Sequence, residues 1–277
     1  MITAGDEVFI REHAYIPEHL PEYAARVSSG EPFLAGDFVF YSSSESLIFV
    51  GFPLRDTFEE MKMTQTLEGL VRKRSPGRVV LIAPAIPPRF GNAGPPDSYY
   101  RLDLECFRLP AKVKNMVQRA SRDLQVRRAR NLESDHLRLI SGFARARPLE
   151  EGTRAIFSRI PQYLAASPTA WVFSARSGSG ELAGFDIAEF GPSRYAFYMF
   201  NFRSREKTVP GTSDLLLAEI IRTAQEQGKR AMNLGLGISP GVAFFKKKWG
   251  GRPFLEYRSI TYPVSPIASL ESLLSKL

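Results

Sequence analysis

Residues 195–236 read YAFYMFNFRSREKTVPGTSDLLLAEIIRTAQEQGKRAMNLGL. The spacing of the apolar residues changes twice along this stretch, which predicts a strand at 195–202, a helix at 213–227 and a strand at 230–236. The helix is the clearest element, because its leucines and isoleucines form one stripe, Ser213 or Asp214 can cap its start and Gly228 ends it. This order of strand, helix and strand indicates an α/β fold.

Similar patterns surround this stretch. Upstream they predict a basic helix from Pro110 to Arg122, a strand at 124–130, helices at 135–146 and 149–165, and strands at 170–175 and 181–190. Downstream they predict a short helix at 240–249, an alternating strand at 254–262 and a weak amphipathic helix after Pro263. The strands at 170–175, 181–190 and 195–202 are joined by turns rich in Gly, Ser and Pro, so we expect a three-stranded antiparallel meander.

The first 110 residues predict a smaller α/β unit. Its expected elements are a hairpin of strands 38–41 and 46–52, a helix at 57–74, and strands at 79–83 and 99–107. A long loop rich in proline and glycine, residues 84–96, separates the last two strands. We therefore place a domain boundary near residue 110, between an N-terminal part (1–110) and a C-terminal part (111–277).

Composition predicts a folded cytoplasmic protein. The chain has 277 residues, 44% hydrophobic and 24% charged, and no run approaches the roughly 18 apolar residues of a spanning helix. Asp6 and Glu7 lie where a signal peptide would be basic and then apolar. The only cysteine, Cys106, excludes an intramolecular disulfide, and its neighbours predict a strand interior.

The net charge of +8 favours an anionic ligand, such as a phosphorylated cofactor, tRNA, a phosphosugar or an anionic surface. Part of the excess is concentrated in one segment, which has a single acidic residue, Asp123. Its basic residues are Lys112, Lys114, Arg119, Arg122, Arg127, Arg128 and Arg130. The segment is interpreted either as a surface for a polyanion or as a solvated helix face.

The sequence contains no motif for a metal site, a serine nucleophile or a nucleotide-binding loop. No set of His, Cys, Asp or Glu has the spacing of a metal site, so no metal is expected. There is no nucleophile elbow and no phosphate-binding Gly-Lys-Thr loop. The three histidines, His13, His19 and His136, are predicted to be surface residues.

The order of expected elements from Leu124 to Tyr262 resembles that of the GNAT superfamily of acyltransferases. In that family a glycine-bearing loop leads into a long helix whose N-terminus binds the pyrophosphate of coenzyme A, because the first N–H groups of a helix are unpaired and its dipole is positive there. The resemblance implies a cofactor site at Phe202, Gly211, Thr212, Ser213 and Asp214. This chain has Thr208 where the family loop has Arg or Gln, and Ser213 where it has Gly or Ala.

Within the superfamily, the chain is most similar to the FemAB-like branch of peptidyltransferases and N-acyltransferases. The matching stretches are Leu102-Asp103-Leu104, Gly211 to Leu217, Asn233-Leu234-Gly235 and Phe245 to Gly251, within residues 99 to 262. The resemblance implies an α/β (α+β) fold with a GNAT-like mixed sheet flanked by helices. It also implies two tandem GNAT-like halves, the N-terminal one shortened, and parallel strands around Tyr198 and Asn233 that diverge at their C-terminal ends.

Lys246 is the principal catalytic candidate. Lys246, Lys248 and Gly250 stand where ordinary GNAT enzymes read Tyr, one residue, Lys, one residue, Gly. An ammonium group can stabilise negative charge on an acyl oxygen or leaving group, and a desolvated lysine can act as a base. Since consecutive helical residues lie about 100° apart, Lys246 is expected to line the cleft and Lys247 or Lys248 to turn outward.

The second catalytic candidate is Asn233, which can orient the acceptor amine or cap the following loop. The residues assigned to substrate or polyanion binding are Lys112, Arg119, Arg122, Asn201, Gly235 and Lys248.

The expected activity is transfer of an acyl or aminoacyl group to an amine. The donor is an acyl thioester of coenzyme A or a carrier protein, or an aminoacyl-tRNA; the acceptor is a small molecule or a cell-wall or polysaccharide amine. The helices between Asp135 and Ala165 are too short for the tRNA-binding arm of the peptidoglycan members, so thioester donors stay at least equally open. The alternative is a non-catalytic GNAT-fold binding or regulatory protein that uses its basic face on an anionic polymer.

Overall fold

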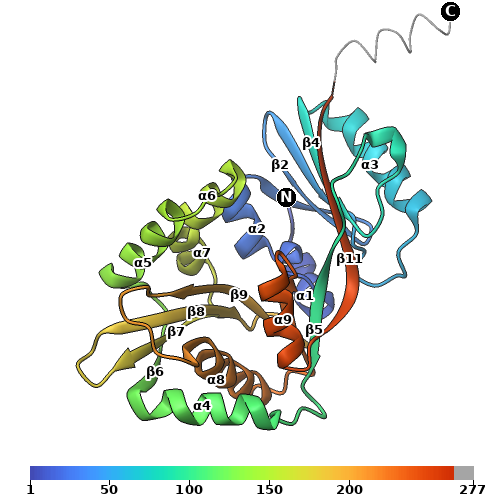
Figure 1. Cartoon of the computed structure of the whole chain (residues 1–277). Helices are drawn as coiled ribbons and strands as arrows, with labels where there is room; N and C mark the ends of the chain where they lie inside the picture. Colours follow the sequence, from blue (N-terminus) through green and yellow to red (C-terminus); the bar gives the residue numbers. More distant parts are fainter. Residues whose placement is uncertain (265–277) are drawn as a thin grey trace, which may run out of the picture.

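The computed structural model describes residues 1–264, and their strands form one mixed sheet in the order β1-β2-β3-β4-β11-β5-β10-β9-β8-β7-β6 (Figure 1). The strands are β1 Glu31–Ala35, β2 Phe38–Ser42, β3 Ser46–Val50, β4 Arg78–Ala83, β5 Asp97–Asp103, β6 Leu124–Ala129, β7 Ala170–Ser177, β8 Leu182–Glu189, β9 Tyr195–Arg203, β10 Ala231–Leu236 and β11 Arg252–Pro263. The α/β fold with a mixed sheet is therefore confirmed. The amphipathic helix predicted after Pro263 falls outside the described residues.

Helices flank this sheet on both faces. They are α1 Ala4–His13, α2 Pro21–Ser28, α3 Glu60–Arg74, α4 Ala111–Asp123, α5 Ser134–Arg145, α6 Glu151–Ser158, α7 Ile160–Ala166, α8 Thr212–Glu226 and α9 Pro240–Lys248, with short 3-10 turns η1 Pro17–His19 and η2 Pro88–Phe90. The helices α4 and α8 lie together on one face of the C-terminal strands, and α5, α6 and α7 lie on the opposite side of these strands (Figure 1). No helix among the described residues is long and apolar enough to cross a membrane.

Two strands connect the parts of the sheet. The first half of β11 pairs with β5 and its second half pairs with β4, both antiparallel. On its other side β5 pairs with β10, so a strand that precedes residue 110 lies inside the C-terminal part of the sheet. The division at residue 110 stays a prediction, and the sheet itself is continuous across it.

Most of the predicted elements are present, but α1, α2 and β1 were not predicted, and two predicted elements differ in their bounds. The single helix expected at 149–165 is two helices, because the chain turns at Arg159 and Pro161 occupies the first turn of α7. The strand β5 ends at Asp103, whose carboxylate accepts a hydrogen bond from the N–H of Glu105 and so starts a turn. Cys106 lies after that turn and is exposed, so its predicted place in a strand interior is wrong.

The surface prediction is wrong for two of the three histidines. His19 and His136 are 0% and 1% exposed, because each ring has a polar partner inside the protein. His19 Nε2 lies 2.8 Å from the carbonyl oxygen of Phe52, and His136 Nε2 lies 2.7 Å from Ser174 Oγ. Burial lowers the pKa of both rings, that of His19 to about 4, so both are neutral packing residues.

The contact between α4 and α8 depends on a glycine. Gly211 precedes α8 with φ of 87°, and a Cβ added there would lie 2.6 Å from the carbonyl oxygen of Met116 in α4. We expect Gly211→Ala to destabilise the fold by about 1 to 3 kcal/mol in urea unfolding, from strain and steric overlap. The control is Gly69→Ala in α3, where nothing lies within 4 Å of the added Cβ and stability should rise by about 0.5 to 1 kcal/mol. Equal stability of the two variants would contradict a steric need for glycine at position 211.

Candidate functional site

The parallel strands β9 and β10 separate before they end. Only three residue pairs join them, from Ala231↔Tyr195 to Asn233↔Phe197, although β9 continues to Arg203 and β10 to Leu236. A bulge in β9 against β8 and a register shift in β10 against β5 accompany the separation. The predicted divergence of these two strands is confirmed, and it leaves room between their C-terminal ends for side chains from other elements.

Lys246 reaches into this region from α9. Its side chain is only 3% exposed, and Nζ donates a hydrogen bond to the carbonyl oxygen of Leu236 at the end of β10. Nζ also lies 5.8 Å from the ring centroid of Tyr100 and 3.5 Å from the Cβ position that a side chain at Gly235 would have. Gly235 has φ of 79°, so a larger residue there would be strained and would crowd the amine. Burial lowers the pKa of Lys246 to about 7, although Asp97 acts in the opposite direction.

The neighbouring lysines point elsewhere, and it is Lys248, not Lys246, that contacts the first turn of α8. Lys247 is exposed. Lys248 Nζ forms an ion pair of 2.5 Å with Asp214 Oδ1, and Trp249 Nε1 donates to the same oxygen at 3.0 Å. Asp214 therefore faces α9 with its charge compensated and ties α8 to α9.

A second polar group extends along β9. Asn201 Nδ2 donates to Asp186 Oδ1 at 2.5 Å and to Ser213 Oγ at 3.3 Å, so it links β8 to the first turn of α8. Asp186 is fully buried and its Oδ2 has no hydrogen-bond partner. Burial raises the pKa of Asp186 to about 7, with Asn201 and Tyr198 acting in the opposite direction. Sequence reasoning missed Asp186, although a lone carboxylate within the apolar strand 183–188 is a visible signal.

Asn233 occupies a different position from Lys246. It is fully buried, its Nδ2 donates to the carbonyl oxygen of Tyr15 at 2.8 Å, and its Oδ1 accepts from the N–H of Gly235 at 2.7 Å. These contacts fit the capping interpretation, while its role towards an acceptor amine stays a prediction. A cavity of about 780 Å³ lies next to Tyr15 and is bordered by the first residues of β9 and β10, at the opposite end of these strands from Lys246.

The residues assigned to the cofactor separate into two groups. Phe202 is 1% exposed and packs in the core beneath α5, α6 and α7, so its side chain is not available to a ligand. Gly211, Thr212, Ser213 and Asp214 do form the start of α8, which has no side-chain cap. The Thr212 hydroxyl instead donates to the carbonyl oxygen of Val209. The N–H of Thr212 donates to the same oxygen, so the N–H groups of Ser213 and Asp214 are the ones left for an anion, and the binding itself stays a prediction.

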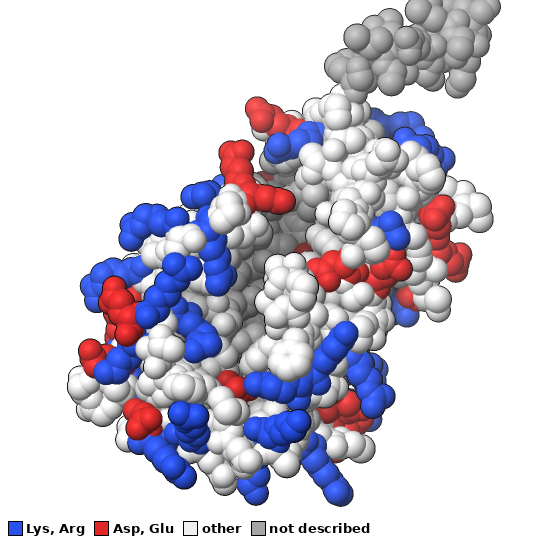
Figure 2. Space-filling view, in the orientation of Figure 1, with Lys and Arg blue, Asp and Glu red and all other residues white. Residues whose placement is uncertain are grey.

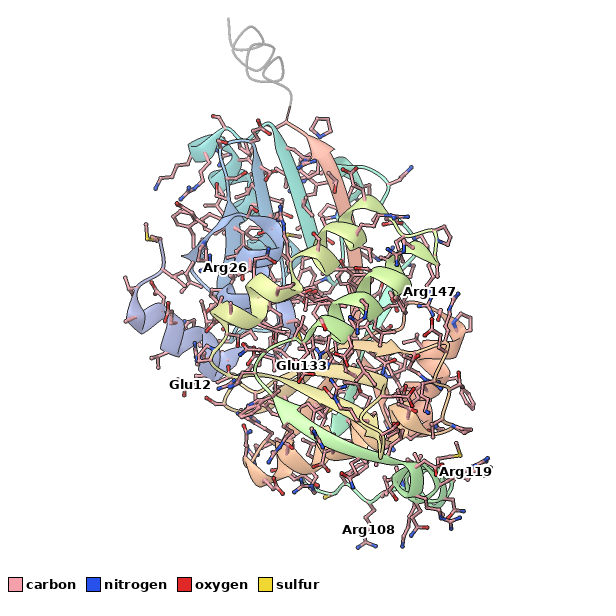
Figure 3. The ribbon with its side chains drawn as sticks, turned by 90° about the vertical axis from the view of Figure 1, so that its left-hand side faces the viewer. Glu12, Arg26, Arg108, Arg119, Glu133 and Arg147 are labelled. Carbon is pink, nitrogen blue, oxygen red and sulfur yellow. The ribbon has the colours of Figure 1, made fainter. Side chains whose placement is uncertain are left out.

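The basic side chains of α4 lie on the surface beside the start of α8. Lys112, Arg119 and Arg122 are exposed, and none forms an ion pair within the described chain. Figure 3 shows Arg119 projecting outward from α4, well away from Arg147 and Arg26. In Figure 2 basic side chains gather over the lower part of the molecule and along the left side of a hollow. These three residues are thus separate from the buried group around Lys246.

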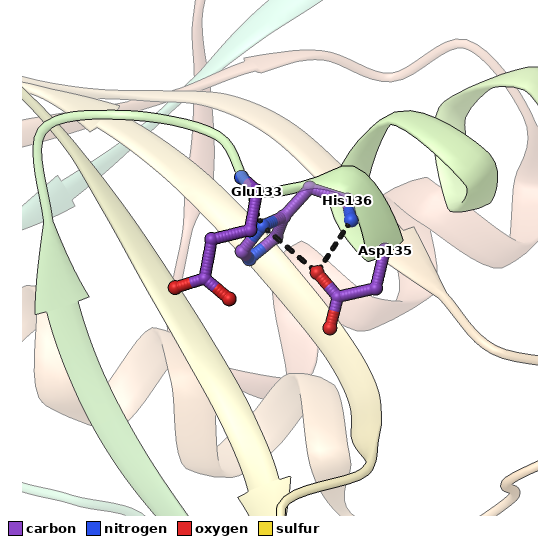
Figure 4. A group of neighbouring side chains, drawn as sticks. All are labelled: Glu133, Asp135 and His136. Carbon is purple, nitrogen blue, oxygen red and sulfur yellow. Dashed lines mark hydrogen bonds and ion pairs between the residues drawn. The ribbon is translucent and has the colours of Figure 1, made fainter.

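One cluster has the composition of a metal site. Glu133, Asp135 and His136 bring their ligand atoms within 4.8 Å of one another at the start of α5 (Figure 4). However, His136 Nδ1 accepts the N–H of Glu133 at 2.9 Å, and Arg176 forms ion pairs with both carboxylates, of 2.7 Å to Glu133 and 2.6 Å to Asp135. The guanidinium supplies the positive charge that a metal would supply, so the cluster is a structural cap.

The fold is similar to those of several solved structures. No family model and no curated protein matches the sequence. Among solved structures, FemX is similar with a TM-score of 0.63 at 12% identity, over 98% of each chain. The C-terminal domain (DUF2156) of an Agrobacterium fabrum protein assigned as a lysylphosphatidylglycerol synthetase gives 0.62 at 16%, over 98% of this chain and 93% of that one.

A tandem GNAT protein from the clavulanic acid biosynthesis pathway gives a TM-score of 0.51 at 13% identity, over 83% of this chain and 78% of that one. The chain has a GNAT-like, FemAB-like fold. Identities this low establish the arrangement of the backbone and leave the chemistry to the residues of the site.

The burial of Lys246 makes stability depend on pH. Its pKa is about 7 in the folded protein and about 10.4 in an unfolded chain, so between these values the unfolded state binds more protons and stability rises with pH. We expect the stability of the wild type relative to Lys246→Met to rise by up to about 1.4 kcal/mol per pH unit between pH 7 and 10. Urea unfolding at several pH values measures this. Lys247→Met, at an exposed position, should give a constant difference, and a constant difference for both variants would refute the low pKa.

Proposed function

We propose that the protein is an acyltransferase that moves an acyl or aminoacyl group from an activated ester or thioester to an amine. The observation that carries the proposal is the buried Lys246 amine, held at the separation of β9 and β10 with a pKa near neutrality. Buried ionisable groups with shifted pKa values gather at functional sites, because catalysis needs groups that change protonation near the working pH. FemX and lysylphosphatidylglycerol synthetase, whose folds are similar, support an aminoacyl group as the cargo.

The reaction assigns two separate tasks to the protein. The lone pair of the acceptor nitrogen attacks the acyl carbon, negative charge develops on the carbonyl oxygen, and the carbon–sulfur or carbon–oxygen bond of the donor then breaks. In its protonated form Lys246 stabilises that charge. The nitrogen must lose one proton and the leaving sulfur or oxygen must gain one. Asp186, with a free Oδ2 and a pKa of about 7, is our candidate to accept the proton.

The donor we propose carries phosphate, as coenzyme A, a carrier-protein arm and tRNA all do. The uncapped start of α8 offers backbone N–H groups. The negative charge of Asp214, which would repel an anion there, is neutralised by its ion pair with Lys248. The exposed cations of α4 lie alongside, since α4 packs against α8 at Gly211. The acceptor we propose is an amine of a small molecule, of the cell wall or of a polysaccharide.

Removal of the Lys246 charge tests the proposed chemistry. Lys246→Met keeps much of the length of the stem, so we expect turnover on an identified donor and acceptor pair to fall by about 10²-fold or more, with little change in KM. Lys247→Met should keep full turnover, because this neighbour is exposed. Steady-state kinetics of both variants is the measurement. Equal turnover in the two variants would contradict a catalytic role for Lys246.

Salt dependence tests the basic surface of α4. If tRNA binds there, its affinity should fall steeply with salt, and the double variant Arg119→Gln, Arg122→Gln should lessen the log–log slope by about 2, because each contact neutralises one phosphate. The control is Arg222→Gln in α8, whose guanidinium already pairs with Glu219 and Glu226. Filter binding at several salt concentrations gives the slopes. No tRNA binding at low salt would leave α4 as a solvated face, and tRNA binding without transfer would favour the non-catalytic alternative.

A further inference from the structure

Glu18 is a carboxylate that forms no ion pair in the part of the chain that the structure describes. It lies in η1, between α1 and α2, and its Oε2 accepts a hydrogen bond of 2.8 Å from the hydroxyl of Tyr99. The carboxylate also accepts a hydrogen bond from the backbone N–H of Glu18 itself, and the residue is partly exposed. No Lys, Arg or His of the described chain forms an ion pair with Glu18.

This arrangement is unfavourable for the charged form of Glu18. Withdrawal from water disfavours a charged carboxylate, and burial accordingly raises the pKa of Glu18. Glu22, four residues further along the chain in α2, differs from Glu18 because Arg11 forms an ion pair with it. A group that carries such a cost without an ionic partner among the described residues is a candidate for a ligand of opposite charge.

Aromatic rings surround this carboxylate. Tyr41 donates its hydroxyl to the backbone carbonyl oxygen of Glu18 at 2.9 Å, and Tyr257 packs edge-on against Tyr99 with ring centroids 5.6 Å apart. Burial raises the pKa of Tyr23, Tyr41, Tyr99 and Tyr257, and the charge of Glu18 acts in the same direction on all four. Aromatic faces attract cations, so a carboxylate among phenols is chemically suited to an ammonium group.

The site is connected to the hollow of the molecule and to Lys246. Tyr23 is on α2 and Tyr257 is on β11, the two elements that border the hollow in Figures 1 and 2. Tyr99, which holds Glu18, is the cross-strand partner of Leu236 in β10. The carbonyl oxygen of Leu236 in turn accepts the hydrogen bond from Lys246. Tyr99 and Tyr100 are consecutive in β5 and point to opposite faces of the sheet, so Glu18 contacts one face while Lys246 Nζ lies 5.8 Å from the ring of Tyr100 on the other.

We propose that Glu18 and the tyrosines around it bind a primary ammonium group of the substrate, with the Glu18 carboxylate as its counter-ion. The binding of an ammonium is independent of the proposed function, but its assignment to a substrate rests on it. The ammonium can belong to the α-amino group of an aminoacyl donor or to a non-reacting amine of the acceptor. A cation seated there would relieve the cost of the unpaired carboxylate.

Small probes test the binding without any transfer reaction. L-alaninamide represents an aminoacyl group with its α-ammonium, n-butylamine represents an acceptor amine, and N-acetyl-L-alaninamide is the neutral counterpart of the first. NMR titration of the full chain gives a dissociation constant for each. Binding of L-alaninamide or n-butylamine in preference to the neutral probe supports the site, and whichever binds more tightly identifies the source of the ammonium. Binding of neither, or equal binding of the neutral probe, overturns it.

Two variants locate the binding at Glu18. Glu18→Gln keeps the size of the side chain and an oxygen for Tyr99, so we expect at least a 10-fold weaker binding of the amine with a melting temperature equal to or above that of the wild type. Glu22→Gln makes the same chemical change at a carboxylate that Arg11 already pairs, and it should leave amine binding unchanged. Unchanged binding in Glu18→Gln, or equal loss in both variants, overturns the assignment. Because the readout is binding, failure here is distinct from failure of Lys246 to catalyse transfer.

Discussion

The hydrogen bonding between β9 and β10 stops after three residue pairs, and the candidate site depends on that interruption. A continued ladder would join these strands to their ends and close the space that Lys246 enters. Instead the carbonyl oxygen of Leu236 accepts from Lys246 Nζ, and Gly235 leaves room for the amine. Around the same opening, α8 and α9 are fixed to each other by the contacts of Asp214 with Lys248 and Trp249. The sheet thus determines where the polar groups meet.

The ionisable groups near the opening are compensated to different degrees. Asp214 has an ion pair and an indole N–H, so it is a stable structural carboxylate. Lys246 and Asp186 have only neutral hydrogen-bond partners, and burial moves both pKa values to about 7. At neutral pH each of these two groups can therefore gain or lose a proton at little cost. This difference separates the groups suited to proton transfer from those that hold the helices together.

The sequence predicted the backbone better than the site. The helix α8, the meander of β7, β8 and β9, and the divergence of β9 from β10 follow from local periodicity and from the family resemblance. The direction of Lys246 followed from helical geometry, since it needs no long-range information. Asp186 and Glu18 were missed because their importance lies in burial without an ion pair among the described residues, which only the folded chain reveals. The position of β11 between β4 and β5 is equally a long-range property.

Unpaired charge inside a protein costs stability, and this chain bears that cost at Glu18, Asp186 and Lys246 together. Other carboxylates are paired. Arg176 forms ion pairs with Glu133 and Asp135, and Arg11 forms one with Glu22. The uncompensated groups belong to neighbouring elements: Tyr99, which holds Glu18, is the strand partner of Leu236, which holds Lys246. Stability alone does not favour such a concentration. An ammonium group of a substrate would compensate Glu18 on binding, and the negative charge that develops on the acyl oxygen during transfer would compensate protonated Lys246, so the arrangement favours a ligand site over a packing defect.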